Sequence, residues 1–343
     1  MPLLICRSLI ARWWQVRSQR VCGLSRAIPA EVDRSWLALR GARSPRIHVF
    51  LSSSEIHLAH QLHRGADEVV EMARAAVERA RGYTDDVEWS CMDATRSDPE
   101  LIARLVRVAI GAGATTINLP DTVGCARPDQ VSAMFRELQA RVPEVSGVTL
   151  SFHGQDDLGM ATANSLAAIS AGARQVEVAV NGLGERAGNT AFEEVVMALR
   201  VHGEALGVET AVDTHGIWAI SQVVARRSGF AVPPNKAIVG GNAFRHASGI
   251  HQDGVLKCRE TYEAVDPAEI GHPVGTQIVL GKLSGRAGFA SRVRALGIAP
   301  SDAALERAFA RFQELADGRS EIADEELVAL CREPEAGARS ARA

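Results

Sequence analysis

The sequence changes from strand to helix within residues 151–165, SFHGQDDLGMATANS. The apolar run 148–152 predicts a buried strand that ends at His153, and an acidic pair then opens a helix. A strand end, a polar cluster and a helix start in this order are typical of the C-terminal face of an α/β barrel. His153 and Gln155 stand two residues apart on extended chain, so their side chains point to the same side. An imidazole and an amide in that arrangement are suited to holding one metal ion.

The alternation of strand and helix continues along residues 21–207. Short apolar runs predict six strands, at residues 21–26, 46–53, 87–93, 115–120, 147–153 and 175–181. Helical stretches lie between them, and β–α units of about 30 residues form a parallel sheet with helices outside. Eight such units close a barrel. The predicted fold class is therefore an α/β, TIM (β/α)8-type barrel that is two strands short.

Three of the helices carry specific sequence signals. In residues 66–81 the apolar positions recur on one face, as in an amphipathic helix. Asp98 is placed to cap a helix N-terminus, and Pro99 suits the first turn. Thr190 and Glu193 have the spacing of a capping box, which predicts a helix that begins at Thr190.

The pattern changes after about residue 207. Residues 232–257 are rich in Gly, Pro and His and have no regular period, which predicts an irregular region. A short strand and two helices are predicted after it, at residues 276–281, 302–317 and 324–332. We therefore expect a barrel domain at 21–207 and a small, mostly helical accessory region at 208–332.

The two ends of the chain differ in composition from the rest. Residues 1–20, MPLLICRSLIARWWQVRSQR, contain four arginines and no acid. This composition occurs in transit peptides, but we expect a non-homologous segment joined where an N-terminus was lost. Residues 333–343, EPEAGARSARA, are expected to be a disordered tail.

The overall composition excludes several classes of partner. Of the 343 residues 46% are hydrophobic and 23% are charged, which is ordinary for a globular protein with a sizeable core. A net charge of −3 gives no reason to expect nucleic acid or an anionic membrane as a partner. Six cysteines without CxxC spacing indicate a reduced, cytoplasmic compartment. No apolar run approaches the roughly 20 residues that a membrane span needs.

Long motifs in both regions match one family. These motifs are DATRSD (93–98), INLPDTVG (117–124), NGLGERAGN (181–189), PNKAIVGGNAF (234–244), SGIHQDGVLK (248–257) and VLGKLSGR (279–286). On these motifs the chain resembles the 2-isopropylmalate synthase family of metal-dependent TIM-barrel acyltransferases from about Val21 to residue 330. Homocitrate and citramalate synthases share the barrel motifs, whereas the last two strings are more similar to isopropylmalate synthase.

The resemblance implies a reaction and its cofactor. Acetyl-CoA, the co-substrate, condenses with the 2-oxo acid 2-oxoisovalerate and the thioester is hydrolysed, which commits carbon to leucine. A divalent metal ion holds the oxo acid and polarises its ketone. The positions that match the family's ligands are His153, Gln155 and Asn189. Gln155 stands where the family usually has His, which favours Mg²⁺ or Mn²⁺ and leaves Zn²⁺ as an alternative. Asn189 also suits plain helix capping.

The resemblance further implies a general base and a dimer. His251, expected in a Gly-rich loop outside the barrel, matches the family's base, and Tyr262 matches its partner. An imidazole exchanges protons near neutral pH. Because this region crosses to the partner subunit's barrel in the family, a homodimer with shared active sites is implied. A surface histidine is the alternative for His251.

Five further residues are expected to contact the substrates. Asn118 and Thr122, at a strand end, match oxo-acid contacts, and Thr122 as a plain strand residue is the alternative. His48 either lines the pocket or is a hydrogen-bonded core histidine. Glu185 and Arg186 suit contacts to CoA or substrate, or they pair with each other or with neighbours.

The chain departs from the family in its first strands. The family opens with an Arg-Asp-Gly strand, whose Asp is a charged metal ligand, and residues 1–20 contain no counterpart. The strands missing from the predicted barrel are therefore its first two, and the family's C-terminal leucine-sensing domain also has no counterpart. Met92 replaces a Glu that many members have. Two functions are consistent with this: an active acyltransferase, or an impaired remnant that acts as an oligomer partner.

Overall fold

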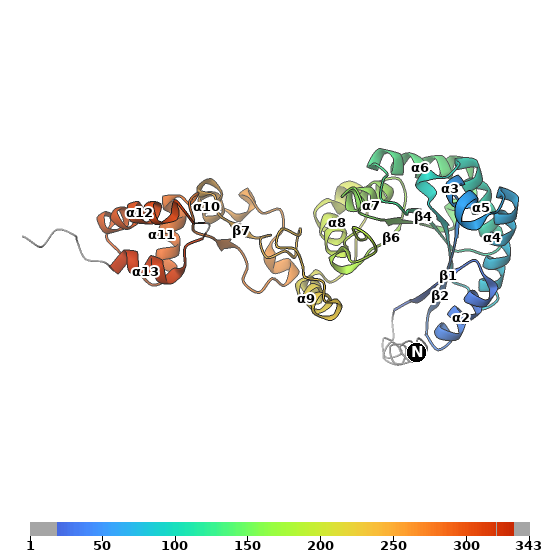
Figure 1. Ribbon diagram of the computed structural model, residues 1–343, viewed down its shortest axis with the longest axis horizontal. Helices are drawn as coiled ribbons and strands as arrows, with labels where there is room; N and C mark the ends of the chain where they lie inside the picture. Colours follow the sequence, from blue (N-terminus) through green and yellow to red (C-terminus); the bar gives the residue numbers. More distant parts are fainter. Residues whose placement is uncertain (1–18, 320, 333–343) are drawn as a thin grey trace, which may run out of the picture. The chain divides into compact units, whose positions relative to one another are not determined.

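The computed structural model describes residues 19–319 and 321–332. The chain divides into two compact units (Figure 1). The first runs to Val195 and takes in Ala205–Val208, and the second comprises Val196–Glu204 and the chain from Glu209 onward. The domain boundary between residues 207 and 208 stays a proposal. The predicted tail, 333–343, lies outside the described residues. The predicted N-terminal segment, 1–20, also lies outside them except for residues 19 and 20.

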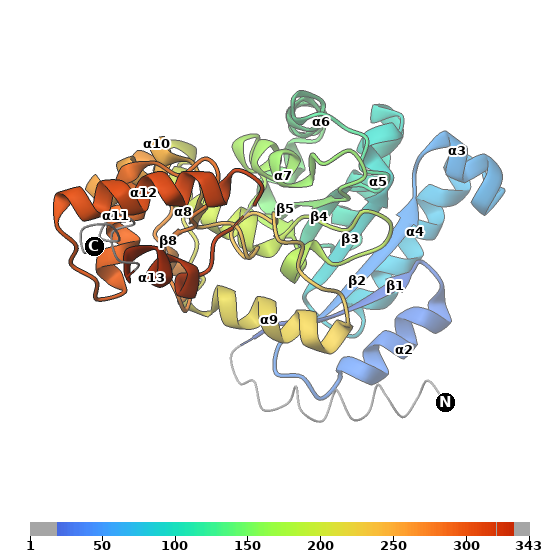
Figure 2. The same cartoon turned by 60° about the vertical axis from the view of Figure 1, so that its left-hand side comes forward.

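Six parallel strands form the sheet of the first unit, and they lie side by side in chain order (Figure 2). The strands are β1 Val21–Arg26, β2 Pro45–Ser52, β3 Val87–Met92, β4 Thr116–Asp121, β5 Thr149–Gly154 and β6 Gln175–Glu177. The helices of this unit are α2 Pro29–Leu39, α3 Glu55–His57, α4 Ala66–Arg81, α5 Pro99–Gly111, α6 Pro128–Arg141 and α7 Ala161–Ser170, and α8 Phe192–Leu206 leads into the second unit. The sheet curls into part of a barrel, so the predicted fold class is confirmed.

Short helical turns complete the connections. A π-helical turn, η1, follows α3, and 3₁₀ turns lie after β3, after α6 and before α8. These turns are η1 Leu58–Leu62, η2 Ala94–Arg96, η3 Pro143–Gly147 and η4 Val180–Gly182.

The pleat of the strands separates an apolar face from a polar face. Odd-numbered positions of β2 and β3, such as Ile47, Val49 and Trp89, are fully buried among the helices in one large core. The even-numbered positions alternate with them and therefore point to the inner face of the curled sheet. Those positions carry polar side chains, including His48 and Ser90. The inner face is therefore the one whose polar side chains could bind a ligand.

Helix α5 begins where the sequence predicts. The Asp98 carboxylate accepts a hydrogen bond from the backbone N–H of Glu100 at 3.2 Å, and Pro99 occupies the first turn. This satisfies one of the backbone donors that a helix N-terminus leaves unpaired.

Replacing Asp98 by alanine is expected to lower the free energy of unfolding by about 1 kcal/mol, because the cap is lost and nothing takes its place. The measurement is urea denaturation, with Glu78→Ala on the exposed face of α4 as the control. Equal midpoints for the two variants would contradict the cap.

The predicted helix start at Thr190 is wrong, because α8 begins at Phe192. The Thr190 hydroxyl bonds instead to the carbonyl oxygens of Gly154 and Ala161, each at 3.3 Å. The Glu193 carboxylate accepts from the backbone N–H of Asn181 at 2.9 Å. Both side chains of the expected capping box therefore serve tertiary contacts.

The ends of the first five predicted strands agree with the structure within two residues, whereas the sixth is shorter than predicted. It ends at Glu177, and a 3₁₀ turn follows at Val180–Gly182. Asn181 has a φ of 63° in this turn. A left-handed residue cannot continue a strand, which explains the early end.

The second unit is mostly helical, as predicted. Its helices are α9 Ile217–Ser228, α10 Gly249–Lys257, α11 Arg286–Ala295, α12 Asp302–Ala316 and α13 Asp324–Arg332. Its two short parallel strands are β7 Arg245–His246 and β8 Gln277–Ile278, and its 3₁₀ turns are η5 Thr214–Gly216, η6 Arg259–Thr261 and η7 Pro267–Ile270. Helices α11 to α13 share a small core, in which Phe289 and Phe312 pack at 5.0 Å between ring centroids. Among the described residues, no helix has both the length and the apolar character that crossing a bilayer requires.

The Gly-rich loop predicted around His251 is wrong. Residues Gly249–Lys257 form α10, and Gly249 and Gly285 approach closely at its start. A Cβ on Gly249 would lie 2.7 Å from the backbone nitrogen of Gly285. The glycine here therefore permits close packing rather than an irregular loop.

Candidate functional site

His153 is the centre of the site at the C-terminal end of the sheet. It lies on β5, and its Nδ1 is 2.8 Å from Oε2 of Glu177 on the neighbouring strand β6. A carboxylate accepts, so Nδ1 carries the proton and donates it. Nε2 then bears the lone pair, and it accepts from the Nε2 amide of Gln155 at 3.1 Å. Glu177 thus fixes the tautomer that presents Nε2 as a ligand atom.

Sequence reasoning missed Glu177. The available signal was its place in the alternating stretch QVEVAVN (175–181), where it shares a face with Gln175. Burial acts to raise the pKa of Glu177, but the hydrogen bond from His153 and the nearby charges outweigh it and hold the pKa below its ordinary value. Glu177 is therefore an ionised carboxylate on the inner face of the curled sheet.

Gln155 and Asn189 each carry a buried amide oxygen near the end of β5. Their backbones form an isolated antiparallel bridge, which places the NGLGERAGN loop beside the end of β5. Oε1 of Gln155 and Oδ1 of Asn189 are buried and accept no hydrogen bond from any residue that the structure describes. An unpaired buried acceptor is costly unless a ligand completes it.

This donor set fits a divalent cation. It consists of one imidazole nitrogen held by a carboxylate and two amide oxygens without partners. Oxygen donors suit Mg²⁺ and Mn²⁺, and a carboxylate behind a ligating histidine is a recurrent arrangement at metal sites. The three predicted ligand residues are neighbours, since Gln155 bonds to His153 and its backbone bridges that of Asn189.

His48 and Asn118 lie deeper on the inner face, joined through Ser90. Nδ2 of Asn118 donates to Oγ of Ser90 at 2.8 Å, and that hydroxyl donates to Nε2 of His48 at 2.6 Å. Nδ1 of His48 is 3.4 Å from Glu177. Burial lowers the pKa of His48 to about 4 despite that carboxylate, so its imidazole is neutral at neutral pH. His48 and His153 thus lie on two sides of Glu177.

Thr122, Arg186 and Glu185 lie at the loops beyond the strands. The Thr122 hydroxyl accepts from the backbone N–H of Asp93 at 2.9 Å, which is a structural role. Arg186 donates to Asp157 at 2.8 and 3.0 Å and to the carbonyl of Thr122 at 2.7 Å. Glu185 is exposed and lies 3.8 Å from Arg186. Arg186 therefore pairs with Asp157 and joins two loops at this end of the sheet.

His251 and Tyr262 lie together in the second unit. Their rings stack with centroids 4.0 Å apart, and a Cβ on Gly254 would lie 2.5 Å from the Tyr262 ring. The neighbouring His246 bonds to the buried Glu263 at 2.9 Å. The pair of predicted catalytic residues is thus formed within one unit.

A second polar cluster, which sequence reasoning also missed, lies at the N-terminal ends of the strands. Arg46 donates to Asp86 at 2.8 Å, to Glu88 at 2.9 Å and to Gln175 at 2.6 Å. Gln175 also donates to Glu88 at 2.7 Å. Burial, and next the charge of Glu177, raise the pKa of Glu88 to about 7 although Arg46 opposes them. We call Arg46, Asp86, Glu88 and Gln175 the floor cluster.

Comparisons with known proteins place the chain among similar sequences of one name. The 2-isopropylmalate synthases of Methylorubrum populi and Syntrophus aciditrophicus are each 49% identical to the chain, over 95% and 93% of its length. The predicted resemblance is thereby confirmed. The chain spans 62% of the length of each of these curated relatives.

Solved structures and family models identify the fold. An HMG-CoA lyase from Acinetobacter baumannii, in complex with coenzyme A and 3-methylmalate, matches with a TM-score of 0.51 and 22% identity, over 62% of this chain and 69% of that chain. A model described as homocitrate synthase post-HMGL domain-like matches residues 238–320, and one described as HMGL-like matches residues 9–224. Since the latter match covers more than half of the sequence, the chain belongs to the HMGL-like family.

Proposed function

We propose that this chain carries the catalytic barrel of a 2-isopropylmalate synthase. The reaction is the condensation of acetyl-CoA with 2-oxoisovalerate followed by hydrolysis of the thioester, the committed step of leucine biosynthesis. The observation that carries the proposal is the donor set of His153, Gln155 and Asn189 beside the strand ends. The 49% identity to synthases of that name supports the choice of substrates.

His153, Gln155 and Asn189 would hold the metal ion, with Mg²⁺ or Mn²⁺ preferred over Zn²⁺ because two of the three donors are amide oxygens. When bound, the ion supplies Lewis acidity to the ketone of the oxo acid. Glu177 orients His153 and keeps the Nε2 lone pair available. To hold an ion, His153 and Gln155 would give up the hydrogen bond between their side chains.

The substrates would lie along the inner face and its loops. Neutral His48 and Asn118, joined through Ser90, offer a polar wall for the oxo acid. Thr122, Glu185 and Arg186 belong to the loops at the strand ends, where we place contacts to the oxo acid and to CoA. The Arg186 guanidinium brings a positive charge to that end of the sheet, where it is paired with Asp157.

His251 is the proposed general base that takes a methyl proton from acetyl-CoA, at an imidazole nitrogen. Tyr262 stacks on the ring at 4.0 Å and fixes its plane. We propose a homodimer in which the second unit of one subunit serves the barrel of its partner, and a cytoplasmic location that matches a biosynthetic role.

The proposed function is tested by release of free thiol from acetyl-CoA. The chain is expected to release coenzyme A when 2-oxoisovalerate and Mn²⁺ are both present, and chelation is expected to stop the release. Preference for 2-oxoglutarate would identify a homocitrate synthase and preference for pyruvate a citramalate synthase. A folded, dimeric and manganese-loaded protein that releases no thiol with any of the three would overturn the proposal.

Replacing Glu177 by glutamine is expected to weaken Mn²⁺ binding by about 10–100-fold, because the carboxylate that orients the His153 imidazole is lost. Isothermal titration with Mn²⁺ measures the affinity directly. Glu204→Gln, an exposed position on α8, is the matched control and should bind as the unaltered chain does. Unchanged affinity in the Glu177 variant would show that the carboxylate does not serve a metal ligand.

A further inference from the structure

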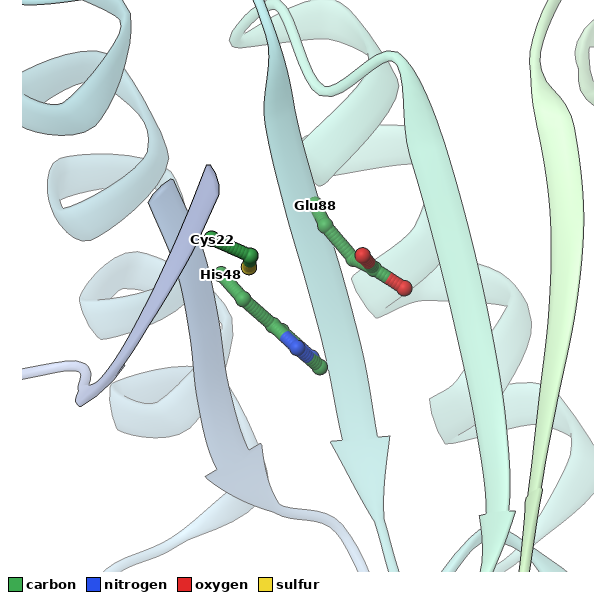
Figure 3. A group of neighbouring side chains, drawn as sticks. All are labelled: Cys22, His48 and Glu88. Carbon is green, nitrogen blue, oxygen red and sulfur yellow. The ribbon is translucent and has the colours of Figure 1, made fainter. Parts of the chain in front are cut away.

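Three strands of the sheet each bring one ligand atom to a common point, which Glu177 separates from His153. Cys22 of β1, His48 of β2 and Glu88 of β3 lie on the same face of the sheet (Figure 3). A sulfur, an imidazole nitrogen and a carboxylate oxygen all lie within 4.8 Å of one another. The strand register explains this, since His48 pairs with Glu88 and Cys22 pairs with Arg46, two residues before His48. The arrangement is therefore built into the sheet.

The chemistry of these donors selects a class of metal ion. A thiolate, an imidazole and a carboxylate are ligands of Zn²⁺ and Co²⁺, whereas Mg²⁺ and Ca²⁺ prefer oxygen alone. Three protein ligands leave a fourth tetrahedral position for water. The Cys22 thiol would lose its proton to solvent, and thiolate and carboxylate together would balance the charge of the ion.

The surrounding charges also favour a cation. Glu88, Asp86 and Glu177 contribute three carboxylates around the point, against the guanidinium of Arg46 and that of Arg20, which pairs with Asp86. If Glu88 turns one oxygen to an ion, Arg46 keeps its bond to Asp86 at 2.8 Å.

The imidazole of His48 can take part without leaving its strand. It bonds to Ser90 at 2.6 Å and lies 3.4 Å from Glu177, and an ion would replace one of these contacts.

We propose that Cys22, His48 and Glu88 form a transition-metal site of the zinc class, distinct from the site at His153, Gln155 and Asn189. The ion ties the edge strand β1 to β2 and β3 through side chains. This second site does not depend on the proposed synthase activity.

Cobalt titration tests the site, because a thiolate ligand gives Co²⁺ a near-ultraviolet charge-transfer band. The His153 group contains no sulfur, so cobalt bound there gives no such band. The unaltered chain is expected to develop the band up to one equivalent of Co²⁺, and Zn²⁺ should bleach it. Cys22→Ser should lose the band, while Cys258→Ser, an exposed cysteine of the second unit, should keep it.

A second measurement tests the site in the unaltered chain, so that the proposal can be tested even if Cys22→Ser fails to fold. In the unaltered chain, Zn²⁺ is expected to protect Cys22 from alkylation by iodoacetamide, as read by mass spectrometry, and to leave Cys258 reactive. Absence of the band in the unaltered chain, persistence of the band in folded Cys22→Ser, or equal alkylation of Cys22 with and without Zn²⁺ would each overturn the proposal.

Discussion

Replacement of Arg46 by methionine is expected to lower the free energy of unfolding by about 3–5 kcal/mol near pH 8, because removing one partner leaves a buried charge without compensation. The guanidinium is buried and donates to Asp86, Glu88 and Gln175 at 2.6 to 2.9 Å. Methionine fills a similar volume but offers no donor. The buried Glu88 carboxylate would then face the charge of Glu177 alone.

Guanidinium chloride denaturation of the metal-free protein measures the effect of Arg46→Met. Arg104→Met is the matched control, since Arg104 makes an exposed ion pair with Asp67, and such pairs contribute about 0–1 kcal/mol. The double variant Arg46→Met with Glu88→Gln should recover part of the loss, because the unpaired carboxylate is gone. If Arg46→Met costs no more than Arg104→Met, the floor cluster does not hold a buried charge.

Replacement of Glu88 by glutamine is expected to stabilise the metal-free protein more at pH 8 than at pH 4.5, with a change of about 3 kcal/mol between the two. The folded-state pKa of Glu88 is about 7, against an ordinary value of 4.5. Between these values the folded protein holds a proton that the unfolded chain has released, so the stability that Glu88 contributes is lost as pH rises toward 7. Glutamine carries no charge to lose.

The comparison with Glu88→Gln is needed because the stability that depends on His48 changes with pH in the opposite direction. Burial lowers the pKa of His48 from 6.5 to about 4, so the unfolded chain binds its proton first and stability falls as pH decreases below 6.5. The two trends offset each other in the unaltered protein. The difference between the variant and the unaltered protein, measured by denaturation across this pH range with a chelator present, isolates Glu88. A difference that stays constant with pH would contradict the raised pKa.

The sequence determined the first five strands to within two residues and the polar residues at the strand ends. Apolar runs with helical stretches between them predict a parallel sheet, because strand and helix periodicities are local properties of the chain. His153 and Gln155 were predicted on one side of a strand end from spacing alone, and the structure places them 3.1 Å apart through their side chains. Asn189 was predicted as a ligand from the motif resemblance, and its backbone forms an isolated β-bridge with that of Gln155.

Only the tertiary structure decided which distant residues meet. Glu177 reaches His153 because β5 and β6 are neighbours, and Arg46 reaches Gln175 across the inner face, 129 positions along the chain. No local pattern records such contacts. The capping box expected at Thr190 failed for the same reason, since its hydroxyl finds Gly154 rather than its own helix. Periodicity is a local property of the chain, whereas the partner of a buried polar group depends on how strands and loops pack, because leaving such a group unpaired is costly.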